Sequence, residues 1–212
     1  PSSGEFFLHV LGGGKPRGIC GSGLLDLAGQ LFLNHMIDGK GKLIPERCGW
    51  RYEKREGIGH LVLVEAEDSA TGKDLSISQA ELDSLIRSKA AMYAILETAA
   101  ASVGVSLQDV KKFYVAGTFG TYISPESAIA LGMLPDLPLE RFISLGNSSL
   151  EGATELLVFR DKYIELFKIK DKVTYLELNV NQEFMQRFSA ARFLPHTDAG
   201  LFPSVPKKMQ RI

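Results

Sequence analysis

The 212-residue chain has little of what several classes of protein require. Its two cysteines, Cys20 and Cys48, are too few for a disulfide framework and show no C-x-x-C spacing. Because 24 lysines and arginines nearly balance 25 aspartates and glutamates, no strong field draws nucleic acid or an anionic membrane. No apolar run approaches the roughly 20 residues of a membrane-spanning helix, and no signal-peptide pattern is present. We therefore expect a cytoplasmic protein that binds neither nucleic acid nor membrane.

The two thiols leave two interpretations open. Two subunits that each contribute two thiolates could share an iron-sulfur cluster, whereas buried, unreactive thiols would need no ligand. None of the four histidines has a second ligand at metal spacing; they are His9, His35, His60 and His196. No metal site is therefore expected within this chain.

Apolar periodicity and capping residues predict strands that alternate with helices. The predicted strands cover residues 5–11, 59–65, 75–77, 112–116, 141–145 and 173–178, and the predicted helices cover 24–36, 79–102, 125–131, 150–168 and 181–191. Ser78 and Glu81 form a capping box at the start of the longest helix. Residues 112–116 lack polar alternation, as expected of a central strand covered on both faces. The alternation predicts an α/β fold, a sheet flanked by helices.

Three short apolar runs end in glycines and small hydroxyl residues and then open a helix. These turns lie at residues 18–23, 117–120 and 146–149. A glycine-lined turn lets backbone approach a ligand and directs N–H groups at it, which suits a phosphate or a nucleotide. The predicted nucleotide-binding residues are Gly117, Thr118, Phe119 and Gly120, with Gly21, Ser22 and Gly23 as a second group.

Each turn also has a purely structural interpretation. Residues 117–120 could be a tight connection between a core strand and a helix, and Phe119 could belong to the core. Gly21 and Gly23 could serve close packing, with Ser22 as a helix N-cap, and the hydroxyls of residues 148–149 could be caps. No catalytic residue can be named, since the spacing supports neither a serine or cysteine nucleophile with its histidine nor the dinucleotide order G-x-G-x-x-G.

The order of these motifs resembles a known family, the reductive activators of corrinoid proteins. The matching segments are GICGSG at 18–23, LIRSKAA at 85–91, VAGTFG at 115–120 with residues 129–135, GNS at 146–148 with EGA at 151–153, and FLPH at 193–196. All five are similar to segments of the C-terminal domain of those activators, in the same order along nearly the whole chain. Five separated motifs are much harder to match by chance than one glycine loop.

The resemblance implies an actin-like ATPase fold of the ribonuclease H-like type, with a mixed sheet flanked by helices. Such activators use ATP to return cob(II)alamin to cob(I)alamin in anaerobic methyl transfer, and they carry a ferredoxin-like 2Fe–2S domain. Residues 115–120 occupy the place of the adenosine motif. Arg87 and Lys89 occupy a helix from which related chaperones reach toward the nucleotide, although solvated surface is the alternative for both.

Neither the acidic phosphate-binding hairpins nor the cysteine spacing of a ferredoxin domain is recognisable. We therefore expect a fragment, with residues 1–192 as the second lobe of the ATPase domain and residues 193–212 as an irregular tail packed on the surface. ATP with magnesium would bind a cleft shared with the missing lobe, and the 2Fe–2S cluster would belong to the parent protein. The fragment alone would be inactive.

The expected partner is the corrinoid protein of a methyltransferase system, and a homodimer is left open. Two alternatives also remain open. The chain could belong to another actin-like enzyme, such as a 2-hydroxyacyl-CoA dehydratase activator or a small-molecule kinase, or it could be a non-catalytic module that binds a partner.

Overall fold

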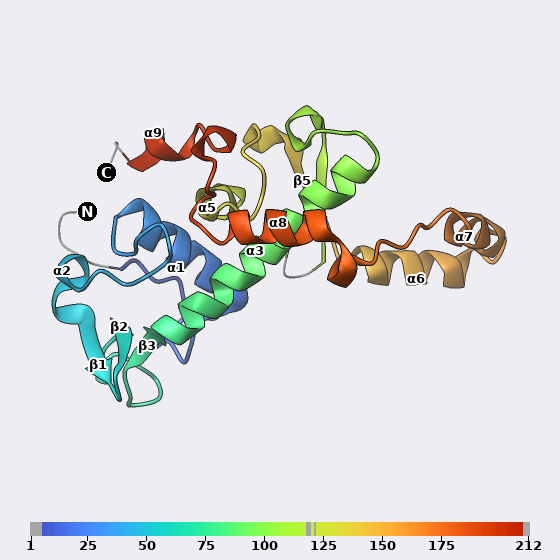
Figure 1. Cartoon of the computed structure of the whole chain (residues 1–212). Coiled ribbons are helices and arrows are strands. Elements are labelled where there is room, and N and C mark those ends of the chain that lie inside the picture. The colour runs from blue at the N-terminus through green and yellow to red at the C-terminus, as the bar shows by residue number, and fades with distance from the viewer. Residues whose placement is uncertain (1–5, 118–119, 121, 210–212) are drawn as a thin grey trace.

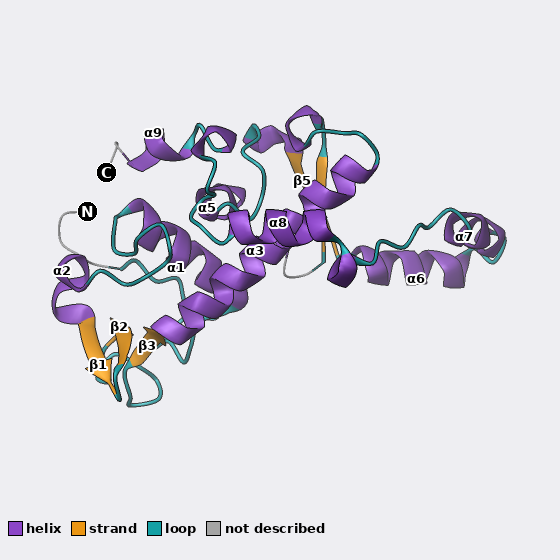
Figure 2. Ribbon diagram, viewed as in Figure 1, coloured by secondary structure: helices purple, strands orange, loops and turns teal. Residues whose placement is uncertain are grey.

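The computed structural model describes residues 6–117, 120 and 122–209. The helices are α1 (Gly21–Leu33), α2 (Pro45–Cys48), α3 (Gln79–Ser102), α5 (Pro125–Leu131), α6 (Ser148–Val158), α7 (Lys162–Lys170), α8 (Gln182–Ala191) and α9 (Val205–Met209). The strands are β1 (Tyr52–Arg55), β2 (Ile58–Val64), β3 (Leu75–Ser78), β4 (Phe113–Ala116) and β5 (Phe142–Gly146). Helices make up most of the regular structure (Figure 2).

The strands form two separate small sheets. β1, β2 and β3 pair antiparallel in chain order, and Leu61 in the middle strand is fully buried. β4 and β5 pair parallel, and the rings of Phe113 and Phe142 lie 5.4 Å apart across this pair. The predicted α/β class with strands of mixed direction is confirmed.

Helix α3 begins where its capping box predicts. The Ser78 hydroxyl accepts from the Glu81 N–H, and the Glu81 carboxylate accepts from the Ser78 N–H at 2.7 Å. Buried residues then recur at helical spacing, among them Leu82, Ile86 and Tyr93. Helix α8 packs against α3 (Figure 1), and β2 and β3 contact the same helix.

Helices α1 and α5 pack closely because small residues meet at their crossing. A Cβ added to Gly29 of α1 would lie 3.2 Å from the Cβ of Ser127 in α5. Ile129 and Leu131 of α5 are buried beside Leu25 and Leu31 of α1 in the main hydrophobic core.

The C-terminal segment differs from the irregular surface tail that we expected. Leu194, Phe202 and Val205 are buried in the main core, at 5%, 0% and 1% exposure, and α9 forms within the segment. The ring of Phe202 lies 5.5 Å from that of Tyr93 on α3. The C-terminal segment therefore contributes side chains to the main hydrophobic core and does not lie on the surface.

Some predicted elements are wrong. The described residues of 5–11 form no strand, nor does 173–178, and the predicted helix 150–168 is divided into α6 and α7. Residues 40–55, for which the sequence analysis predicts no element, contain α2 and β1. None of the helices within the described ranges combines the length and apolar character needed to span a lipid bilayer.

Candidate nucleotide site

Parallel pairing of β4 and β5 places two of the three glycine turns side by side. Ala116 pairs with Gly146 at the carboxyl ends of the two strands, and the Gly117 N–H donates to the Gly146 carbonyl at 2.7 Å. Ligands of open α/β sheets characteristically bind beyond the carboxyl ends of parallel strands. This edge, which we call the glycine edge, is defined by Gly117 and Gly146.

Both residues of the glycine edge have backbone angles that favour glycine, and the described residues leave space beside them. Gly117 has φ +95° and Gly146 has φ +64°, values that side chains rarely tolerate. Apart from the glycine itself and its two chain neighbours, no described atom lies within 4 Å of a Cβ built on either residue. A flat ligand could therefore approach this backbone without displacing the described residues around it.

The rest of the predicted 117–120 motif divides into two parts. Thr118 and Phe119 lie outside the described residues. A Cβ on Gly120 would lie only 2.6 Å from Cγ1 of Val115, so this glycine lets the turn fold back onto its own strand. Gly120 thus has a packing role that the sequence prediction did not separate from ligand contact.

Helix α6 begins directly beside the glycine edge. The Asn147 side chain accepts from the Leu150 N–H at 3.2 Å and is the N-cap, whereas the hydroxyl residues 148–149 lie inside the first turn. The positive end of the α6 dipole is therefore directed at the edge. Sequence reasoning missed the proximity of Gly117 and Gly146, although two strand–glycine–helix units in succession are a signal for parallel neighbours.

The predicted group Gly21, Ser22 and Gly23 lies at the start of α1. The N-cap is Cys20, not Ser22, because the Cys20 sulfur accepts from the Gly23 N–H at 3.4 Å. A Cβ on Gly23 would lie 3.2 Å from Cγ1 of Ile19, so the turn is packed. Cys20 is exposed, and hydrogen bonds from Ser22 and from the Gly23 N–H lower its thiol pKa. The interpretation of buried thiols therefore holds for Cys48 and is wrong for Cys20.

Lys89 lies in the core and not on a solvated surface. Its side chain is fully buried, and its ammonium donates to the carbonyl oxygens of Phe193 and Pro195 at 2.7 and 2.8 Å. Burial lowers the pKa of Lys89 to about 7. The surface interpretation is wrong, and because both contacts fix the C-terminal segment to α3, we leave Lys89 out of the proposed nucleotide site.

A polar pocket of about 470 Å³ lies between α1 and the start of α5. Its lining residues are Asp26, Gln30, Leu33, Ser124, Glu126 and Ser127. One buried carboxylate oxygen of Asp26 has no hydrogen-bond partner among the described residues. In the part of the chain that the structure describes, no group of three or more histidines, cysteines, aspartates or glutamates could hold a metal ion.

Comparison with known proteins identifies the domain. Residues 1–206 match the family described as the C-terminal domain of RACo, the ASKHA domain. The chain belongs to this family. The match confirms the actin-like fold predicted from the motifs, since ASKHA domains are the actin-like class.

Individual relatives agree with the family match. A solved reductive activator for a corrinoid, iron-sulfur protein superposes with a TM-score of 0.85 at 42% identity, over 92% of this chain and 31% of its own. The corrinoid activation enzyme RamQ of Eubacterium limosum is 26% identical over 88% of this chain. A Methanosarcina barkeri reductase of the Co(II) methylated amine-specific corrinoid protein is 25% identical over 49% of it. The chain spans 32% of the length of RamQ and 19% of that of the reductase.

Proposed function

We propose that this chain takes part in the ATP-dependent reductive activation of a corrinoid protein, from cob(II)alamin to cob(I)alamin, and that it supplies the adenosine side of the nucleotide cleft. One observation carries the proposal. Gly117 and Gly146 lie in contact at the carboxyl ends of two parallel strands, and beyond their chain neighbours no described atom lies within 4 Å of the position that a Cβ would take on either residue.

The chain's own residues would bind and orient the nucleoside. The backbone of Gly117 and Gly146 would lie against the base and ribose, because without side chains nothing keeps a planar ring at a distance. The dipole of α6 would favour the anionic end of the ligand at the same edge. We assign the phosphate and magnesium contacts to parts of the longer activators that this chain does not span.

ATP supplies the free energy for an otherwise unfavourable electron transfer. Differential binding of the nucleotide to open and closed arrangements of the cleft would shift a surface that docks the corrinoid protein. The electron would come from a 2Fe–2S domain of the parent protein in a methyltransferase system. The matched relatives are named for corrinoid proteins, which favours this function over a 2-hydroxyacyl-CoA dehydratase activator, a small-molecule kinase or a non-catalytic partner-binding module.

The test is substitution of Gly117 by valine in the complete polypeptide. The branched side chain would fill the open space at the glycine edge, so we expect ATP affinity to fall at least about tenfold, or 1.4 kcal/mol, in calorimetric titration. The rate of cob(I)alamin formation at limiting ATP should fall in parallel.

Gly104→Val is the matched control. Gly104 has φ +71° and the same open surroundings, but it lies in the turn that ends α3. The Gly104→Val variant carries a similar backbone strain, but its side chain lies outside the glycine edge and would not contact ATP, so ATP affinity should stay unchanged. Equal ATP affinity in both variants, with both folded by circular dichroism, would refute the proposed site.

A further inference from the structure

Two of the five family motifs meet in the structure, the segments at 85–91 and 193–196. Lys89 of the first donates its Nζ to the carbonyl oxygens of Phe193 and Pro195, at 2.7 and 2.8 Å. Burial of a charged or polar nitrogen is costly even when it is hydrogen-bonded, and Lys89 is fully buried. A methionine would fill similar space without that cost, so packing alone does not account for this lysine.

The Pro195 carbonyl that accepts from Lys89 also lies against the end of α5. A Cβ built on Gly132, the C-cap of α5, would lie 1.9 Å from the Pro195 oxygen and 2.6 Å from its carbonyl carbon. The contact therefore joins backbone to backbone, with no flexible side chain between the two segments. In a close-packed interior, a displacement of the Pro195 carbonyl passes directly to the end of α5.

Helix α5 is the next helix after Gly117, and its body is enclosed. Residues 128–131 are at most 1% exposed, so the helix responds to a shift at its end as one piece. Described residues before the helix are packed as well, because Gly120 folds back onto Val115 and Ile123 packs against the main core. A shift at the end of α5 therefore reaches the packed residues that lead back to Gly117.

We infer that Lys89 is a positioning residue for the glycine edge: by holding the Pro195 carbonyl against Gly132, it sets the place of α5 and thereby of Gly117. The inference rests on the proposed function, in which Gly117 contacts the nucleoside. Because Lys89 is fully buried, it acts through the backbone and not by contact with ATP. Without its Nζ both carbonyls lose a hydrogen-bond donor, and Pro195 relaxes from its place against Gly132.

An NMR measurement without nucleotide separates this inference from the proposed function. Isotopic labelling of alanine carbonyl carbons and glycine nitrogens in the complete polypeptide selects glycines that follow an alanine, which in this chain are Gly29, Gly117 and Gly200. The signal lost in Gly117→Val identifies Gly117. In Lys89→Met we expect all three signals to move, since Gly29 packs against α5. A lysine that only holds the C-terminal segment to α3 would move Gly200 and leave Gly117 in place, which would overturn the inference.

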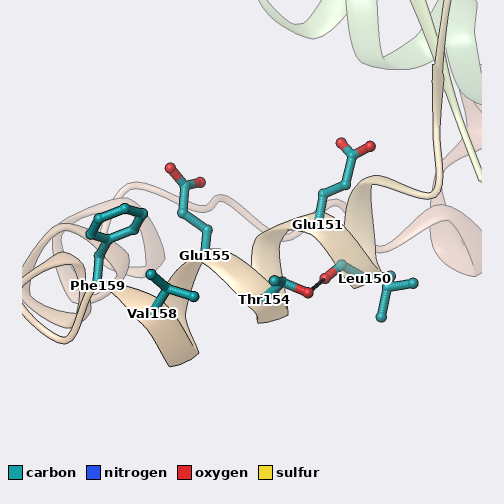
Figure 3. A pocket seen from close by; sticks show the side chains of 6 residues that line it. All are labelled: Leu150, Glu151, Thr154, Glu155, Val158 and Phe159. Atoms are coloured by element: carbon teal, nitrogen blue, oxygen red, sulfur yellow. Dashed lines mark hydrogen bonds between the residues drawn. The ribbon is translucent and has the colours of Figure 1, made fainter.

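Thr154→Val is the matched control for the lost hydrogen bonds. Thr154 lies on α6, and its hydroxyl donates to the Leu150 carbonyl at 2.8 Å (Figure 3). The variant likewise removes a donor from a backbone carbonyl, but at an exposed position, so the three glycine signals should stay in place. A movement of the Gly117 signal as large as in Lys89→Met would contradict the inference.

ATP binding tests the consequence for the site. In calorimetric titration of the complete polypeptide, Lys89→Met should bind ATP at least about fivefold more weakly, while cob(I)alamin formation at saturating ATP keeps the parent rate. Leu61→Ala removes a fully buried side chain from the separate three-stranded sheet and should lower stability without changing ATP affinity.

Two results of the titration would overturn the inference: the same ATP affinity in Lys89→Met and in the parent, or an equal weakening in Leu61→Ala. If the parent itself binds no ATP, the proposed function fails, and the Gly117 signal still decides whether Lys89 positions this residue.

Discussion

Lys89 is a charged side chain that the fold has enclosed. Its neighbours include the ring of Tyr93, which packs against His196, and burial and the charge of Lys89 together lower the pKa of His196. Two backbone carbonyls accept hydrogen bonds from the ammonium and offset part of the cost of its desolvation. The balance between these two effects makes the stability of the fold depend on pH.

The sign of that dependence follows from the direction of the pKa shift. The unfolded chain keeps the Lys89 proton up to about pH 10.4, whereas the folded chain releases it above about 7. Between these values the unfolded state binds more protons, so the free energy of unfolding rises with pH, by up to about 1.4 kcal/mol per unit. Well below pH 7 both the folded and the unfolded chain hold the Lys89 proton, so the free energy of unfolding no longer changes with pH through this residue.

Substitution of Lys89 by methionine should remove this rise. From pH 7.5 to pH 9.5 we expect the unfolding free energy of the parent chain to gain about 2 kcal/mol over that of the Lys89→Met variant, measured by urea denaturation. Lys42→Met is the control, since Lys42 forms an exposed ion pair with Asp83 and should keep the parent slope. Identical slopes in the parent and in Lys89→Met would show that Lys89 stays charged when buried.

At the scale of the element, capping residues decide which predictions succeed. The starts of α3, α5 and α8 follow from Ser78, Ser124 and Asn181, whose side chains accept from N–H groups of the first turn. The break between α6 and α7 has no such signal, because no glycine or proline lies between Val158 and Lys162. Capping chemistry is local, so the sequence displays it.

The failed strand predictions have a different cause. Residues 173–178 are rich in β-formers but find no partner strand among the described residues, and the described part of 5–11 behaves likewise. Strand propensity measures fit to a pleated surface and says nothing of whether a neighbour exists. Pairing is a long-range event, and for the same reason the contact between Gly117 and Gly146 was not predictable from either turn alone.

The end of α5 gives the sharpest prediction at this scale. Gly132 has φ +75°, and a Cβ there would overlap the Pro195 carbonyl oxygen at 1.9 Å. Gly132→Ala should therefore lower the free energy of unfolding by about 2–5 kcal/mol, from backbone strain and a forced shift of the C-terminal segment. Chemical denaturation measures the loss. Gly104→Ala has the strain without the overlap and should cost about 1–2 kcal/mol; equal losses would contradict the overlap.

At the scale of the whole molecule, the C-terminal segment joins parts that are distant in sequence. Leu194 donates its N–H to the Gly39 carbonyl at 2.8 Å, and Ser204 donates its N–H to Asp136 at 2.7 Å. Phe202 and Val205 complete the core between α1, α3 and α5. The prolines at 195, 203 and 206 favour an irregular segment, but they show where a chain turns and not what it packs against.

This closure of the core can be tested with a single aromatic side chain. Phe202 is fully buried against Tyr93, so Phe202→Ala should lower the free energy of unfolding by about 3–5 kcal/mol. Phe7, which is 87% exposed, provides the same substitution without a cavity, and Phe7→Ala should stay within about 0.5 kcal/mol of the parent. Thermal and urea denaturation of the three chains would decide. A loss in Phe202→Ala no larger than in Phe7→Ala would mean that the segment lies on the surface.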